Sequence, residues 1–195
     1  MPEAVIKPPS LSLGYPLDEF YAQNKLRLPP LQAVEPMELP EPYRTLLVHE
    51  SDMTSTLENF YGERVHLKPH TRELRNGAYF RAVVLELDDS LRPAEFGCIN
   101  IFLEPFPTKA REEILKAYRP LGRILKDFEI EYVSRPKAFL RIASDTLINR
   151  MLQLTGAHVL YGRRNTLSDA RGNTLAEIIE ILPPTAEPRR ERNHG

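Results

Sequence analysis

Two stretches near the C-terminus decide the fold: Val159-Leu-Tyr-Gly-Arg-Arg-Asn-Thr-Leu167 and Leu175-Ala-Glu-Ile-Ile-Glu-Ile-Leu-Pro-Pro184. Both consist mostly of residues typical of strands, and the turn-forming sequence Ser168-Asp-Ala-Arg-Gly172 lies between them. We therefore expect a β-hairpin that packs into a sheet.

Four charged residues lie within this hairpin. Side chains alternate between the two faces of a strand, so Arg163 and Arg164 point to opposite faces, as do Glu177 and Glu180. A charge on a buried strand is costly unless something pairs with it. The hairpin thus predicts either internal ion pairs or a small anionic ligand. A glutamate among apolar neighbours could have a raised pKa and transfer protons.

The preceding chain alternates predicted strands and helices without a strand–helix–strand rhythm. Further strands are expected at residues 65–74, 79–87, 94–103, 129–133 and 138–142. Helices are expected at residues 43–49, 53–61, 108–117, 121–127 and 145–154, the last ended by Gly156. This order predicts an α+β fold: one domain at residues 41–184, with an antiparallel sheet flanked by helices.

The two ends of the chain differ from this central part. Nine of the 18 prolines lie within the first 42 residues. Residues 1–40 are therefore expected to form an irregular arm, with at most a short helix near Leu17–Gln23, that packs on the domain. Residues 185–195 are expected to be a flexible charged tail.

Composition narrows the function. The 195 residues include 26 basic and 27 acidic ones, a balance that argues against a nucleic-acid partner. With one cysteine, Cys98, and neither a signal peptide nor an apolar run of membrane-spanning length, a soluble cytoplasmic protein is expected. Nothing demands more than a monomer or small homo-oligomer. The five histidines form no metal-binding pattern, and no glycine-rich nucleotide-binding motif is present, so we expect neither metal nor cofactor.

Arg81 is the most informative single charge. In Tyr79-Phe-Arg-Ala-Val-Val-Leu-Glu-Leu87 it shares a strand face with Tyr79, Val83 and Leu85, an apolar face that should point inward. An inward guanidinium suits a carboxylate, which it can bind in two places. The alternative is an internal ion pair with Glu177 or Glu180.

Two turns are expected to open helices beside this strand. They are His49-Glu-Ser-Asp-Met-Thr-Ser-Thr-Leu57 and Arg119-Pro-Leu-Gly-Arg123. Backbone N–H groups at a helix start suit an anion or a hydroxyl. Two such turns and an inward arginine would enclose a pocket for a small anion.

Five segments in order resemble the chorismate lyase (chorismate pyruvate-lyase) family, in particular its longer bacterial branch that forms 4-hydroxybenzoate. They cover roughly residues 43–184 and are Ser51-Asp-Met-Thr54, Tyr79-Phe-Arg81, Arg119-Pro-Leu-Gly-Arg123, Tyr161-Gly-Arg-Arg164 and Glu180-Ile-Leu-Pro183. The resemblance implies a chorismate lyase-like fold, a single domain with an antiparallel sheet of about six strands and a pocket beneath two helical flaps. It also implies cofactor-free conversion of chorismate to 4-hydroxybenzoate and pyruvate, a precursor supply for ubiquinone or phenolic lipids.

The resemblance also implies roles for particular residues. Arg81 would hold the substrate carboxylate, and Arg163 or Arg164 could help with the second one. Met53 and Leu121 would complete the pocket through their backbone groups, and Glu180 would transfer the proton.

One departure concerns Glu180. Aligned without gaps from Gly172 to Pro183, the family glutamate falls on Ile179. Either the strand carries a bulge, which would bring Glu180 to the correct face, or Glu177 acts instead.

Two other readings stay open. The fold resembles ligand-binding domains of certain bacterial transcription regulators, so the protein could be a non-catalytic sensor of a small aromatic carboxylate. An enzyme of the same fold could also act on a related substrate or release another hydroxybenzoate isomer.

Overall fold

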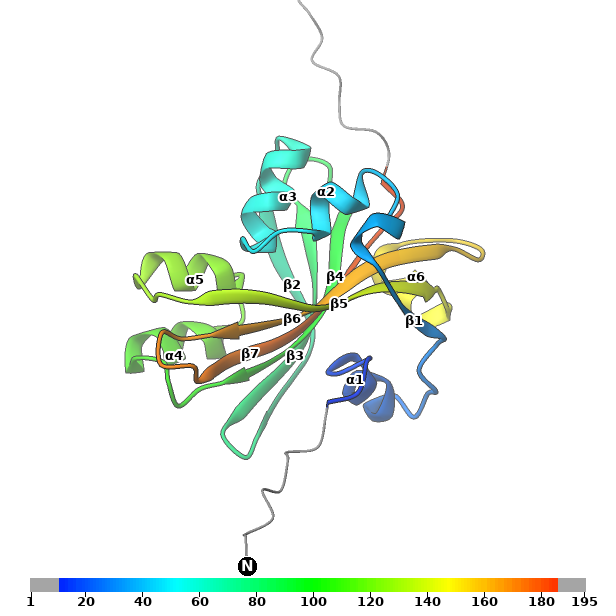
Figure 1. Ribbon diagram of the computed structural model, residues 1–195. Helices are drawn as coiled ribbons and strands as arrows, with labels where there is room; N and C mark the ends of the chain where they lie inside the picture. The colour runs from blue at the N-terminus through cyan, green and yellow to red at the C-terminus, as the bar shows by residue number, and fades with distance from the viewer. Residues whose placement is uncertain (1–10, 186–195) are drawn as a thin grey trace, which may run out of the picture.

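Seven strands form one antiparallel sheet in the computed structural model, which describes residues 11–185 (Figure 1). The strands are β1 (Leu31–Val34), β2 (Val65–Arg75), β3 (Ala78–Leu87), β4 (Pro93–Phe102), β5 (Val133–Ala143), β6 (Val159–Ser168) and β7 (Thr174–Leu182). The helices are α1 (Leu17–Gln23), α2 (Tyr43–Leu47), α3 (Met53–Tyr61), α4 (Thr108–Lys116), α5 (Leu121–Asp127) and α6 (Thr146–Leu152), with a 3-10 turn, η1, at Pro36–Glu38. The prediction of an α+β fold with helices flanking an antiparallel sheet is confirmed, with seven strands instead of about six.

The strand order, β1-β5-β6-β7-β4-β3-β2, puts the C-terminal hairpin at the centre of the sheet. Strands β2, β3 and β4 form one meander, β5, β6 and β7 form another, and the two join where β7 pairs with β4. Glu180 on β7 therefore lies between Gly97 of β4 and Arg163 of β6. The charged side chains of this hairpin lie far from either edge of the sheet, so they need hydrogen-bond or ion-pair partners inside the molecule.

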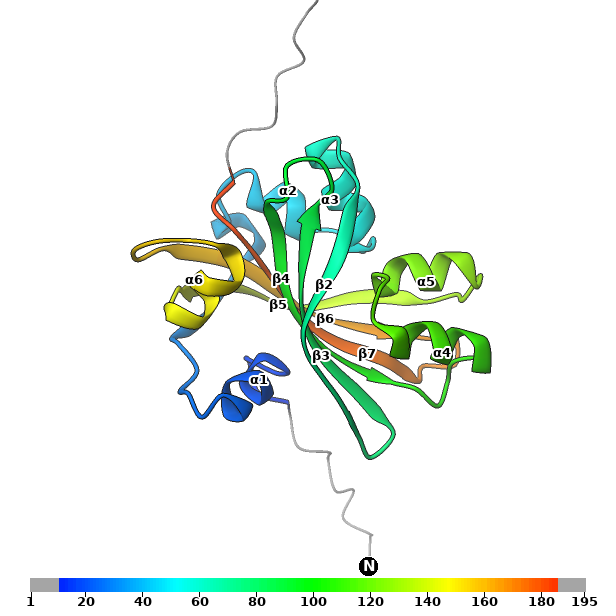
Figure 2. The same cartoon turned by 180° about the vertical axis from the view of Figure 1, so that it is seen from behind.

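The two faces of the sheet are covered by different helices. One face packs on α1 and α6 through a core that includes Phe20, Phe80, Phe96 and Ile148. The other face packs on two helical pairs, α2–α3 and α4–α5. Both views show these pairs as separate units over the sheet (Figure 1, Figure 2). The apolar core on this second face accordingly falls into two clusters, one under each pair.

The prediction of two separate strands at residues 129–133 and 138–142 is wrong. Residues 129–132 are not a strand, and β5 runs as one strand from Val133 to Ala143, with a register shift in its pairing with β6 between Pro136 and Ala138. Strand β1 pairs only with residues 139–142, so Pro136 lies on a stretch that is open on one side. A proline is tolerated there because its missing N–H is not required by a neighbouring strand. Pro69, beside a register shift on edge strand β2, is accommodated in the same way.

Two further details differ from expectation, and one lies outside the described residues. In the described part of the arm, residues 11–40, the chain forms not only α1 but also β1, which joins the sheet at the edge of β5. Helix α6 ends at Gln153, which adopts the left-handed conformation, and not at Gly156. The expected flexible tail at 185–195 lies, except for Thr185, outside the described residues. Across residues 11–185, no helix has the length and apolar character needed to span a membrane.

Candidate functional site

A cavity lies between the sheet and the two helical pairs. Its volume is about 70 Å³, several times the ~10–15 Å³ that one buried water needs on the same measure. The walls are mostly apolar and come from β2, β3, β4, β6 and β7 and from the first turns of α3 and α5. The polar side chains among the lining residues are those of Asp52, Thr54, Arg81, Glu95, Tyr132, Arg163, Asn165 and Glu180.

Arg81 projects from β3 into this cavity, on the predicted inward face. Its side chain is fully buried, and one contact is made, from Nη2 to the carbonyl oxygen of Arg119 at 3.5 Å. Its Nε and Nη1 have no hydrogen-bond partner among the described residues. Burial lowers the pKa of Arg81 to about 10, so the guanidinium remains charged at neutral pH. The alternative of an ion pair with Glu177 or Glu180 is wrong, because both glutamates pair with other arginines.

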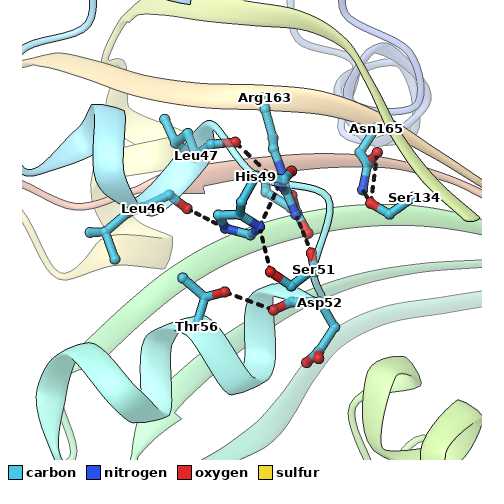
Figure 3. A network of polar contacts seen from close by, with 10 residues as sticks. Leu46, Leu47, His49, Ser51, Asp52, Thr56, Ser134, Arg163 and Asn165 are labelled. Carbon is cyan, nitrogen blue, oxygen red and sulfur yellow. Dashed lines mark hydrogen bonds and ion pairs between the residues drawn. The ribbon is translucent and has the colours of Figure 1, made fainter.

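Arg163 is the internal partner of Glu180. Its Nε donates to Glu180 Oε2, its Nη1 donates to the carbonyl oxygens of Leu47 at 3.2 Å and His49 at 2.9 Å, and its Nη2 donates to that of Ser51 at 3.4 Å. Figure 3 shows Arg163 reaching from its strand into this connection between α2 and α3. All three guanidinium nitrogens are thus engaged by the protein. Arg163 lines the cavity but holds the α2–α3 connection onto the sheet.

The residues around Arg163 are also paired. His49 Nε2 lies 2.8 Å from the carbonyl oxygen of Leu46, and burial, together with the neighbouring Arg163 charge, lowers the pKa of His49. The histidine is therefore neutral at physiological pH. Asn165 Nδ2 donates to Ser134 Oγ at 2.9 Å (Figure 3). This side of the cavity is a rigid polar network.

Glu180 lies on the cavity face of β7. In the pairing of β6 with β7, Leu167 lies opposite Ala176 whereas Ser168 lies opposite Thr174, so β7 has one additional residue, Leu175. This register shift falls between Gly172 and Glu180, in the stretch where a bulge was one of the two expected alternatives.

Glu177 and Arg164 lie on the opposite face of the sheet and are not among the lining residues. Arg164 Nη2 lies 3.7 Å from Glu177 Oε2, which also accepts from Thr166 Oγ1 at 2.9 Å. Burial is the main cause that raises the pKa of Glu177. A role for either residue at the cavity would require its side chain to cross the sheet.

Met53 and Leu121 line the cavity as the first residues of α3 and α5. Asp52 caps α3, since its Oδ1 accepts from the Ser55 N–H at 2.8 Å. The two helix starts also meet each other: a Cβ at Gly122 would lie 3.0 Å from Asp52 Oδ1. The two predicted helix-opening turns therefore lie against each other at the cavity.

Glu95 is a charged lining residue that the sequence reasoning missed. It is 5% exposed, and its Oε2 has no partner among the described residues. Burial, and then the charge of Glu180, raise the pKa of Glu95 well above its ordinary value, against the opposing influence of Arg163. The alternation that placed Arg81 inward would also have placed Glu95 inward, on the same face as Gly97 and Ile99.

The part of the chain that the structure describes contains no cluster of three or more His, Cys, Asp or Glu residues arranged to hold a metal ion. The donors in the cavity are guanidinium and carboxyl groups. The arrangement suits an organic anion with an apolar body.

No family model matches the chain, and no curated protein matches it in sequence. The fold has counterparts among solved structures. PhnF from Mycobacterium smegmatis aligns with a TM-score of 0.54 at 8% identity, over 89% of this chain and 95% of that chain. The effector domain of the same protein aligns with a TM-score of 0.53 at 8% identity, over 69% of this chain and 89% of that one.

A third counterpart is the ligand-binding domain of a proposed GntR-family transcriptional regulator from Bordetella bronchiseptica. Its TM-score is 0.48 at 13% identity, over 66% of this chain and 92% of that chain. At such identities the likeness concerns the fold alone. The chain has the chorismate lyase-like α+β fold that effector domains of GntR-type regulators share.

Proposed function

We propose that the cavity binds a small carboxylate with a ring-sized apolar body, and that Arg81 is its counter-ion. The observation that carries this proposal is the buried guanidinium of Arg81, with Nε and Nη1 unpaired. An unpaired charge in a protein interior is strongly destabilising. A carboxylate can accept from two nitrogens of one guanidinium and would remove that cost.

The walls favour an aromatic or similar ring. The apolar side chains that line the cavity are those of Met53, Leu67, Val83, Leu85, Ile99, Leu121, Leu125, Leu167 and Ile178. Pockets of this kind obtain affinity from apolar contact and orientation from a few polar groups. The engaged nitrogens of Arg163 leave Arg81 as the one lining guanidinium, among residues 11–185, with free donors. This supports binding of a monocarboxylate such as 4-hydroxybenzoate.

A second candidate is a chorismate pyruvate-lyase, which forms this ligand within the cavity. Two observations support it: the ordered segments that resemble that family, and the carboxyl groups of Glu180 and Glu95 in the same cavity as Arg81. Arg81 would hold the ring carboxylate of chorismate. Glu180, itself oriented by Arg163, would accept the ring proton.

The proposed reaction needs no oxidant or cofactor. The bond between the ring carbon and the enolpyruvyl oxygen breaks, and its electron pair leaves with the enolate. The neighbouring ring carbon, which bears the hydroxyl, loses its hydrogen as a proton, and the C–H electrons complete the aromatic ring. The enolate takes up a proton at carbon and becomes pyruvate. Aromatisation drives the reaction, so the protein would supply orientation, charge pairing and proton transfer.

The first test is a calorimetric titration of the protein with 4-hydroxybenzoate. The wild type should bind saturably, and Arg81→Met should weaken binding by at least about tenfold, since it removes a charge-assisted pair of hydrogen bonds. Arg141→Ala, which removes an exposed strand arginine outside the cavity, is the matched control and should bind like the wild type. Equal affinity of Arg81→Met and the wild type would refute the role of Arg81.

The second test separates sensor from enzyme. The purified protein is incubated with chorismate in the absence of metal and nucleotide, and pyruvate and aromatic product are followed together by chromatography. Equimolar pyruvate and 4-hydroxybenzoate would establish the lyase. Saturable binding of 4-hydroxybenzoate without turnover would establish the non-catalytic binding protein.

A further inference from the structure

Glu95 is a second buried polar group whose side chain the protein leaves partly unsatisfied. Its carboxyl lines the cavity, its side chain is 5% exposed, and Oε2 lacks a partner within the described residues. Buried polar atoms in native proteins almost always have a partner. Among residues 11–185, two cavity-lining residues have buried side-chain atoms without a hydrogen-bond partner. They are Arg81 and Glu95.

The strand register separates these two groups along the cavity. Arg81 of β3 pairs with Ile99 of β4, whereas Glu95 pairs with Leu85. Four residues along β4 correspond to roughly 13 Å between the backbone positions. Both side chains line the cavity from these separated positions, so a ring with substituents at opposite ends would contact both.

Gly97 gives the Glu95 carboxyl its position. A Cβ at Gly97 would lie 2.8 Å from Glu95 Oε1, so the missing side chain leaves the space in which this carboxyl lies. Gly97 is also the residue of β4 that pairs with Glu180. The carboxyl of Glu95 thus leans along its strand toward Glu180, which is already ion-paired with Arg163.

One guanidinium beside two carboxyls neutralises only one of them. Since Arg163 is bound to Glu180, Glu95 is left without a counter-ion. Burial and the Glu180 charge raise the pKa of Glu95, which agrees with a neutral acid. A neutral carboxylic acid offers both a donor and an acceptor.

We propose that the buried carboxyl of Glu95 hydrogen-bonds a hydroxyl at the end of the ligand opposite its carboxylate, and so selects para-hydroxylated ring carboxylates. This inference rests on the proposed binding of a ring carboxylate at Arg81. A hydroxyl can donate and accept, as the acid can. A ligand without a hydroxyl at that end of the ring would leave the carboxyl of Glu95 buried and unpaired.

The test compares two ligands that differ by a single hydroxyl, 4-hydroxybenzoate and benzoate, by calorimetric titration of the full chain. The wild type should bind 4-hydroxybenzoate about tenfold more tightly, the preference expected from one buried hydrogen bond. Glu95→Leu replaces the carboxyl by an apolar side chain of similar length. This variant should bind the two ligands with about equal affinity. Glu95→Gln retains a donor and an acceptor, so most of the preference should remain.

Glu86→Gln is the matched control. Glu86 is a buried strand glutamate, 7% exposed, that pairs with Lys68 and does not line the cavity, so this variant should keep the wild-type preference. If Glu95→Leu does not fold, Gly97→Ala displaces the same carboxyl and should lower the preference in its place.

The outcomes separate the two proposals. If Glu95→Leu keeps the wild-type preference, or if its affinity for both ligands falls equally, the role of Glu95 is overturned. Binding of the carboxylate at Arg81 is not contradicted by either result. If the wild type binds neither ligand, the proposed function fails and the selection by Glu95 fails with it.

Discussion

At the scale of single residues, the unusual feature is a buried arginine that the protein does not neutralise. Arg163 and Arg164 each pair with a glutamate, whereas two nitrogens of Arg81 have no partner among residues 11–185. A buried charge of this kind reduces the stability of the protein without ligand. Glu95 Oε2 is likewise without a partner in the same residues. Under the proposed function, an anionic ligand with a hydroxyl would pair with both groups.

Replacing Arg81 should therefore stabilise the empty protein. Arg81→Met keeps a long apolar side chain and removes a buried unpaired charge, so the free energy of unfolding should rise by about 1–3 kcal/mol. Urea unfolding without ligand measures this. Arg163→Met is the contrasting variant: it leaves Glu180 buried without its partner and should cost about 3–5 kcal/mol. A less stable Arg81→Met would mean that Arg81 is satisfied within the protein.

Glu95 should make stability depend on pH. Above the ordinary pKa of ~4.3 for glutamate, the unfolded chain releases the proton that the folded protein retains. The folded state then binds more protons than the unfolded state, so the free energy of unfolding falls as pH rises toward the raised pKa of Glu95. Glu95→Gln cannot ionise in either state, and its advantage over the wild type should grow from pH 5 to pH 8. Urea unfolding at both pH values checks this, and a constant difference would contradict it.

At the scale of elements, the cavity depends on how closely β6 and β7 approach. A Cβ at Gly162 would overlap the backbone oxygen of Glu180. The backbone cannot move aside without disturbing the ion pair of Arg163 with Glu180. Gly162 is therefore required for steric reasons, in contrast to Gly77, where the requirement is a positive φ of 79°.

These two glycines should respond differently to alanine. Gly162→Ala should lower the free energy of unfolding by about 2–3 kcal/mol, as overpacking does in a well-packed core, and should weaken ligand binding. Gly77→Ala has open space around its Cβ and should cost about 1 kcal/mol from backbone strain alone, with binding unchanged. Thermal unfolding and titration of both variants provide the comparison. Equal effects would show that the approach of the two strands does not matter.

At the scale of the whole molecule, the ligand would lie between elements that are far apart in the sequence. The cavity wall draws on five of the seven strands and on both helical pairs. A ligand there would contact both meanders of the sheet and both helical pairs at once. Its binding free energy should therefore add to the stability of the entire fold.

Saturating 4-hydroxybenzoate should raise the melting temperature. At 100 times the dissociation constant the stabilisation is about 2.7 kcal/mol, which for a chain of this size corresponds to roughly 5–10 °C. Arg81→Met, with affinity lowered at least about tenfold, should show at most about half of this shift at the same ligand concentration. Differential scanning calorimetry measures both, and equal shifts in the two proteins would exclude binding at Arg81.

Local periodicity in the sequence determined most elements and the direction of single side chains. The alternation along a strand placed Arg81 inward and put Arg163 opposite Arg164 and Glu177 opposite Glu180, because it depends only on neighbouring residues. The two helix-opening turns at Met53 and Leu121 followed from local capping and turn signals. These features needed no knowledge of strand order.

Only the tertiary structure decided which groups meet. The order of the seven strands paired Arg163 with Glu180 and Arg164 with Glu177, and thereby left Arg81 free. It also joined β1 to the sheet, and it allowed Pro136 to lie within a strand. Glu95 and Glu180 come together across β4 and β7, 85 residues apart in sequence, because of register and the gap at Gly97. Such pairings depend on long-range contacts that no local pattern encodes, and these contacts determine what the cavity can bind.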